Sequence, residues 1–99
     1  MRIYIIHSPK NSKRYFERIR AAEKMLIANG HHVLNPLPDD VEVNNPDYDN
    51  VDAFRQYAHK INLCDGVFAM EGYAKEDLGN QAMAEAMVLR KTIFFEQKV

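Results

Sequence analysis

The sequence has little of what marks secreted, membrane-bound or nucleic-acid-binding proteins. It holds one cysteine, Cys64, so no internal disulfide can form and nothing indicates an oxidising compartment. No signal-peptide pattern opens the chain, and no apolar run approaches the ~20 residues needed to span a bilayer. The formal net charge of −1 provides no basic excess for nucleic acid or an anionic membrane. We therefore expect a cytoplasmic protein with no nucleic-acid and no membrane partner.

Sequence motifs for common cofactors and metals are also missing. There is no Gly-x-Gly-x-x-Gly run and no Walker-type run, which excludes the usual dinucleotide and triphosphate loops. His31 and His32 are adjacent, so on a strand they point to opposite faces and cannot chelate one metal. His7 and His59 lack a ligand spacing. We expect no cofactor and no metal site.

What remains is the composition of one small globular domain. The chain has 99 residues, of which 46% are hydrophobic and 27% charged. That balance is typical of a folded protein rather than a disordered one, and the length allows one hydrophobic core. We predict a single domain over residues 1–99.

The order of patterns predicts alternating strands and helices. Strands are expected at Arg2–Ile6, His31–Asn35, Asp65–Met70 and Thr92–Phe95, from their β-branched and aromatic content. Apolar residues spaced three and four apart predict helices from Lys13 to a stop at Gly30, over residues 51–61 after a cap at Asp49 or Asn50, and from Gly79 to Leu89. The acidic, proline-broken stretch Leu37–Asn50 reads as a long loop. This order predicts an α/β domain whose parallel sheet is covered on both faces.

The loop after the first strand holds groups suited to an anion. Ser8 follows the strand, and Lys10, Ser12 and Lys13 lie at the start of the next helix. Helix N-termini carry unpaired N–H groups and partial positive charge, so hydroxyls and cations beside them suit a phosphate. The alternative is that Ser12 merely caps the helix and the cations are solvated.

The loop after the third strand, Glu71–Leu78, lies at the same sheet edge in this fold class. Its carboxylates could bind ribose hydroxyls, and Tyr73 could stack on a base, with Gly72 and Gly79 at the two ends of the loop. A solvated polar loop would have similar composition. Cys64, at a helix-to-strand junction, reads as a small buried thiol.

Four segments of the chain, RIYIIHSP, ANGHHVLNP, LCDGVFAMEGY and LRKTIFF, together resemble the nucleoside 2-deoxyribosyltransferase-like family. This family includes small phage and bacterial members and the deoxynucleotide N-hydrolases. The likeness covers nearly the whole chain in order and spacing. It implies a flavodoxin-like or Rossmann-like three-layer sandwich with a four-stranded parallel sheet and three main helices. It also implies a homo-oligomer, a dimer or higher, that cleaves the N-glycosidic bond of a nucleoside or nucleotide.

The chemistry that the resemblance implies is double displacement by a glutamate on the third helix. The family places that glutamate in a Gly-Ala-x-x-Glu-like stretch, where this chain has Ala82 or Met83, depending on the alignment. It places an assisting aspartate where this chain has Tyr57. The nearest carboxylate, Glu85, lies on the flank of the apolar face of the predicted third helix. It is either a carboxylate at the boundary between core and solvent or a displaced nucleophile.

Three hypotheses follow, and they leave enzyme status open. In the first, the chain is a nucleotide-binding protein with weak or lost N-glycosidic chemistry. Its phosphate would be held by Ser8, Lys10, Ser12 and Lys13. Its sugar and base would be held by Gly72, Tyr73, Gly79 and Asn80. In the second, it is an active deoxyribosyltransferase or nucleotide N-glycosidase that uses Glu85 or Glu71. In the third, it is a protein-interaction module that uses the Leu37–Asn50 loop.

Overall fold

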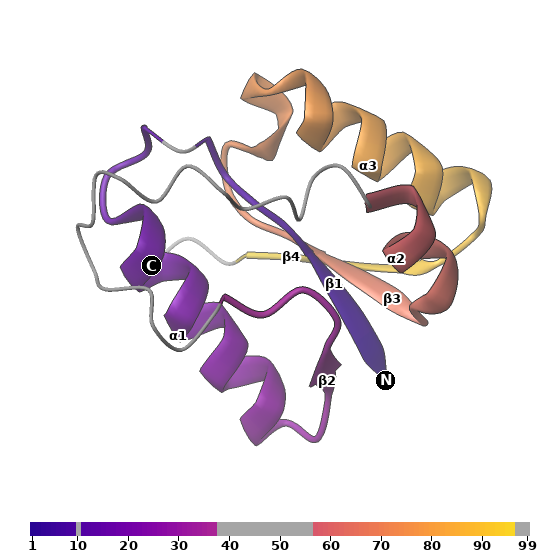
Figure 1. The fold of residues 1–99 in the computed structure, drawn as a ribbon, viewed down its shortest axis with the longest axis horizontal. Coiled ribbons are helices and arrows are strands. Elements are labelled where there is room, and N and C mark those ends of the chain that lie inside the picture. Colours follow the sequence, from indigo (N-terminus) through magenta and orange to yellow (C-terminus); the bar gives the residue numbers. More distant parts are fainter. Residues whose placement is uncertain (10, 38–56, 97–99) are drawn as a thin grey trace.

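The computed structural model describes residues 1–9, 11–37 and 57–96. In chain order its elements are β1 (Arg2–Ile6), α1 (Tyr15–Ala28), β2 (His32–Val33), α2 (Tyr57–Leu63), β3 (Gly66–Ala69), the short 3-10 helix η2 (Tyr73–Lys75), α3 (Asp77–Val88) and β4 (Thr92–Phe95) (Figure 1). The predicted Leu37–Asn50 loop lies outside the described residues after Leu37, and so do Lys10 and the predicted start of the second helix. In the part of the chain that is described, no helix combines the length and apolar character needed to cross a membrane.

The four strands form one parallel sheet in the order β2-β1-β3-β4. From the centre, the chain moves outward from β1 to β2 in one direction and from β3 to β4 in the other. Because such crossovers are right-handed, the helices of the two halves must lie on opposite faces. The predicted α/β fold with four parallel strands and three helices is confirmed, and the strand order reverses between β1 and β3.

Each face of the sheet has its own apolar core. Ile3 and Ile5 of β1 pack with α1, whereas Tyr4 and Ile6 face α2 and α3. This alternation explains why β1 is a continuous apolar run, since both of its faces are buried. Each isoleucine buried this way contributes about 1.5–3 kcal/mol. In Figure 1, α1 lies on one side of the sheet and α2 and α3 on the other, which gives three layers.

Helix α1 begins two residues later than predicted. Residues 11–14 form a turn, and Arg14 has a left-handed backbone (φ 57°) that no helical residue adopts. At the other end Gly30 stops the helix as predicted, with φ +84°. Its N–H donates to the Ile27 carbonyl and that of His31 to the Leu26 carbonyl, which is the Schellman pattern of a helix end.

The segment between β3 and α3 is more ordered than a loop. It contains η2, and α3 already starts at Asp77. Gly79 therefore lies inside the first turn of α3, and not at its first residue as predicted. A Cβ at Gly79 would fall 2.9 Å from the carbonyl carbon of Tyr73 and closer still to its oxygen. Glycine is therefore needed here for the close approach of η2 and α3.

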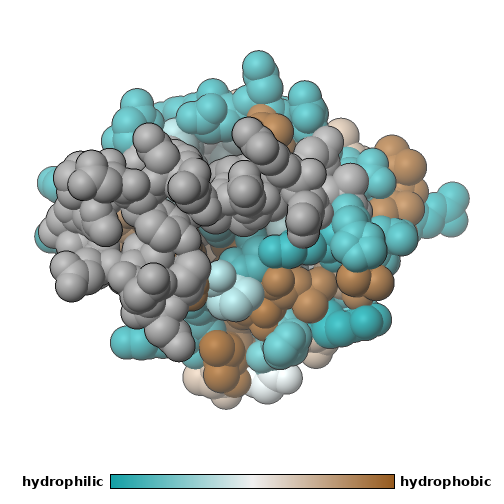
Figure 2. Space-filling view, viewed as in Figure 1, coloured by the Kyte–Doolittle hydropathy of each residue, from teal (hydrophilic) through white to brown (hydrophobic). Residues whose placement is uncertain are grey.

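The surface is ordinary for a globular chain. Figure 2 shows the apolar residues of one face as separate patches among hydrophilic ones. Single exposed apolar side chains, such as Ile27 on α1 and Val88 on α3, are normal on folded proteins.

Candidate functional site

The candidate site lies where β1 and β3 end side by side. Ile6 pairs with Ala69, so the chain leaves the two strands at the same edge of the sheet before turning in opposite directions. In open α/β sheets this point of strand reversal forms a crevice in which ligands bind. Ser8 comes two residues after β1 and Glu71 two residues after β3, so the two predicted loops meet at this edge.

A buried polar cluster holds the end of β1 in place. The Asn35 side chain accepts the N–H of Ile5 and donates to its carbonyl, both at 2.8 Å. Strand β2 has only two residues, so this amide continues the pairing along β1 where the main chain of β2 has stopped. Asn35 Nδ2 also lies 3.5 Å from His7 Nε2, and Tyr15 Oη lies 3.3 Å from His7 Nδ1. These contacts fix the backbone directly before Ser8.

Ser8 is the unusual residue of this cluster. It is 2% exposed, and its Oγ is buried. Among the described residues, this oxygen is the one buried polar side-chain atom that has no hydrogen-bond partner. An unpaired buried hydroxyl costs about 1–3 kcal/mol of stability. Such a group calls for an explanation, and a polar ligand in the crevice would supply its missing partner.

The cationic end of the first loop is open to solvent. Ser12 donates its main-chain N–H to the Pro9 carbonyl at 2.9 Å, which closes a turn. No side chain caps α1, so the alternative that Ser12 serves as its cap is wrong. Lys13 is exposed. The exposed ion pair of Arg14 and Glu17, at 3.8 Å, adds little stability.

Of the second loop, only its first part faces the end of β1. Gly72 has φ +89°, and a Cβ there would lie 3.4 Å from Pro9 Cδ, so the two loops touch at this point. Tyr73 is half-buried and packs against the core under α3. Gly79 is enclosed by η2, and Asn80 Nδ2 donates to the Ala74 carbonyl at 2.9 Å. These last two residues stabilise the loop itself.

The two candidate catalytic carboxylates lie apart. The main chain of Glu71 is held by its N–H donating to Glu96 Oε1 at 2.8 Å and its carbonyl accepting from Arg18 at 3.3 Å. Its side chain is exposed. Glu85 is eight residues along α3 from Asp77, roughly 12 Å at 1.5 Å per residue. Since α3 runs antiparallel to the strands, Glu85 is displaced toward the opposite edge.

Two groups with displaced pKa values, Cys64 and Asp65, lie at that opposite edge, before β3. Burial raises the pKa of the Cys64 thiol, which donates to the Ile61 carbonyl at 2.9 Å, and the predicted buried thiol is confirmed. The main-chain N–H of Arg2, and then its side chain, lower the pKa of the Asp65 carboxyl. Neither group is part of the crevice. Among the described residues no group of histidine, cysteine or acidic side chains could hold a metal.

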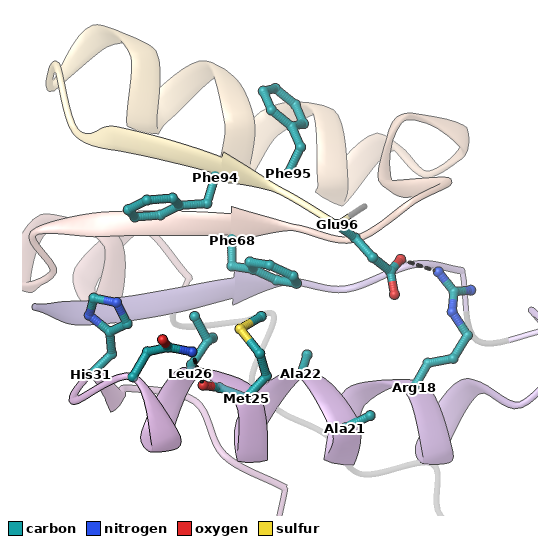
Figure 3. Close-up of a pocket in the computed structure, with 11 residues that line it drawn as sticks. Arg18, Ala21, Ala22, Met25, Leu26, His31, Phe68, Phe94, Phe95 and Glu96 are labelled. Atoms are coloured by element: carbon teal, nitrogen blue, oxygen red, sulfur yellow. Dashed lines mark hydrogen bonds and ion pairs between the residues drawn. The ribbon is translucent and has the colours of Figure 1, made fainter. Parts of the chain in front are cut away.

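A hollow of about 720 Å³ runs between α1 and β4 (Figure 3). Its walls are mainly apolar, with polar groups at both ends, and the lining comprises Arg18, Ala21, Ala22, Met25, Leu26, Asn29, His31, Phe68, Phe94, Phe95 and Glu96. Arg18 and Glu96 are paired with each other across one end, as the dashed line in Figure 3 marks. No residue of the predicted site lines this hollow.

The sequence did not point to Asn35, His7 and Tyr15 as supports of the site. One signal was present, because Asn35 is the last residue of the predicted strand and stands directly before Pro36, where a side chain often replaces main-chain pairing. Comparison with protein-family models, curated proteins and solved structures finds no match to this chain.

Proposed function

We propose that this chain binds a nucleoside or nucleotide in the crevice between β1 and β3, with weak or lost N-glycosidic chemistry. The observation that supports it most is the buried, unpartnered Oγ of Ser8 at the point of strand reversal. The backbone before this hydroxyl is held by the contacts of Asn35 and His7, which position it to donate to an incoming anion.

The phosphate would lie in the turn that leads into α1. Ser8 would donate from the floor of the crevice, and Lys13 would approach from the exposed side, joined by Ser12 and Lys10. Uncapped main-chain N–H groups at the start of a helix favour an anion as well. The sugar and base would extend toward Gly72 and toward the half-buried ring of Tyr73.

Weak or lost catalysis is proposed because no carboxylate occupies the places that the family resemblance assigns to the nucleophile. Ala82 and Met83 are both buried in the core against the sheet. Glu85 is roughly 12 Å along α3 from the crevice edge. Loss of a covalent nucleophile costs several orders of magnitude in rate. The alternative enzyme would have to use Glu71 from the loop or Glu85.

The test is calorimetric titration with 2′-deoxynucleoside 5′-monophosphates, the matching nucleosides and inorganic phosphate, with free base measured by chromatography. We expect the monophosphates to bind more tightly than the nucleosides. Lys13→Glu should weaken the monophosphates about tenfold, because it removes one charge-assisted hydrogen bond of about 1.5 kcal/mol. Lys24→Glu is the matched control, since it makes the same charge change at an exposed site further along α1 and should leave affinity unchanged.

Two results would replace this proposal. Release of free base that disappears in Glu71→Gln or Glu85→Gln would make the chain an active enzyme. No binding to any member of the panel, together with a protein partner lost when residues 37–50 are shortened, would favour an interaction module.

A further inference from the structure

The two edges of the sheet are built differently. On one side β2 has only two residues and is followed by the Asn35 side chain and Pro36, features that prevent another strand from adding there. On the other side β4 has four residues, Thr92–Phe95, with neither a proline nor a charge among them. Among the described residues β4 pairs with β3 alone. An edge of this kind is a template for another strand.

The main-chain groups that point outward on β4 can be identified from its pairing. The N–H of Thr92 donates to the Asp65 carbonyl at 3.3 Å, and that of Glu96 to the Ala69 carbonyl at 2.8 Å, so both face β3. In a parallel ladder the peptide groups alternate in direction. The N–H and carbonyl of Ile93 and Phe95 are therefore directed to the outer edge.

The side chains along this edge are largely apolar and incompletely covered. Phe94 packs toward α1 and Ile93 toward α3, both half-buried. Phe95 is 60% exposed, and in Figure 3 its ring points away from α1. An exposed aromatic next to an open strand edge marks a candidate interaction surface.

We propose that a second copy of this chain occupies this edge, with the two β4 strands antiparallel about a two-fold axis perpendicular to the sheet. The outward groups of one strand must meet the outward groups of the other, and rotation about that axis keeps each face of the sheet on its own side. A residue whose side chain lies on the α1 face of the sheet can therefore pair only with another on the α1 face, and the same holds for the α3 face. Several registers satisfy this condition, and they differ in which residue lies on the two-fold axis.

In the proposed register Phe94 lies opposite Phe94 of the second copy. Ile93 then lies opposite Phe95 on the α3 face, twice by symmetry, and the outward peptide groups of that pair exchange hydrogen bonds. Thr92 lies opposite Glu96 on the α1 face, where its hydroxyl can donate to the carboxylate. Every pair in this register joins apolar with apolar or polar with polar, which is the arrangement that stabilises cross-strand neighbours.

A register centred on Phe95 would set the apolar Phe94 against the charged Glu96. The rival register centres on Ile93 opposite Ile93. It sets Thr92 against Phe94 and the charged Lys91 against Phe95, so four of its five pairs are mismatched. The self-complementary order of residues 92–96 is also the reason to favour a second copy over an unrelated extended peptide. A strand pair this short is a small interface, so we expect a monomer–dimer equilibrium with a dissociation constant of about 1–100 μM.

Sedimentation analysis over a wide concentration range tests the surface. Phe95→Pro removes an N–H that the β3–β4 ladder does not use, and should abolish the dimer while the circular dichroism spectrum and unfolding midpoint stay near those of the natural chain. Phe95→Lys, which keeps that N–H, should weaken it at least tenfold. Val88→Lys is the matched control, at a 76% exposed site on α3, and should leave the dimer intact. A monomer at all concentrations, or a dimer that survives both Phe95 variants, would overturn the proposal.

Cysteine cross-linking tests the register. A non-hydrogen-bonded antiparallel pair brings Cα atoms to about 4.5 Å, within the range of a disulfide. Phe94→Cys should therefore form a covalent dimer on mild oxidation, whereas Ile93→Cys should not; Cys64 is buried and stays silent. Cross-linking of Ile93→Cys alone would refute the register and establish the rival one.

Discussion

Replacement of Ser8 by alanine should make the protein more stable and a poorer ligand binder at the same time. Within the part of the chain that the structure describes, the buried Oγ of Ser8 has no hydrogen-bond partner. Removing it relieves a desolvation cost of about 1–3 kcal/mol, and serine and alanine differ too little in volume to leave a large cavity. With a gain of about 1 kcal/mol, the midpoint of thermal unfolding should rise by about 4–8 °C.

The same change should reduce affinity for a deoxynucleoside monophosphate. A hydrogen bond to a charged group is worth about 1.5–3 kcal/mol, so its loss corresponds to at least a tenfold increase in dissociation constant. Thermal and urea unfolding without ligand, and calorimetry with ligand, measure the two effects separately.

Asn35→Ala is the contrasting variant. Its side chain makes two good hydrogen bonds to Ile5, so its removal leaves a buried N–H and carbonyl unpaired and should cost at least about 2 kcal/mol. A Ser8→Ala protein that is less stable than the natural chain, and binds the ligand equally well, would refute the assignment of Ser8 to the ligand.

Two further predictions concern the fold. Gly79→Ala should lower the free energy of unfolding by about 1–3 kcal/mol, because the new Cβ would collide with the Tyr73 carbonyl. In a helix with free space around it, the same change stabilises by about 1 kcal/mol. Urea denaturation that shows higher stability would contradict this prediction. Asp65→Asn should destabilise the protein at neutral pH. The folded pKa of Asp65 lies below its ordinary value of 3.8, so the stabilisation by its carboxylate is present above that value and is lost as pH falls through the lower folded pKa. The difference in unfolding free energy between the two proteins should therefore shrink below pH 3.8, and a difference independent of pH would refute the role of Arg2.

The elements that the sequence predicted well are those with a strong local period. The unbroken apolar run of β1 and the three- and four-residue spacing in α1 reflect burial that every residue of the element shares. Element ends were less accurate because single contacts decide them. Helix α1 starts late since Arg14 has a left-handed backbone, and β2 is short since the Asn35 side chain takes over its pairing with β1.

For the candidate site, the sequence indicated which loops to consider but not what each residue does in them. The loops that follow β1 and β3 meet at one edge of the sheet, where Pro9 lies against Gly72, as the order of strands and helices predicted. Gly79 and Asn80 stand in the same loop by sequence, yet both are used to hold η2 against α3. In a sequence, a polar loop residue that binds a ligand cannot be told from one that hydrogen-bonds its own loop. Only the contacts in the folded structure distinguish the two.

By itself, then, the sequence determined the alternation of strands and helices, the parallel sheet and the edge at which the loops converge. These follow from periodicity and from the handedness of the chain, which are local properties. The tertiary structure decided that, among the residues it describes, the Ser8 hydroxyl is buried without a partner and β4 pairs on one side alone. Both depend on which atoms of distant segments come within a few ångströms of one another, and no pattern of neighbouring residues carries that information.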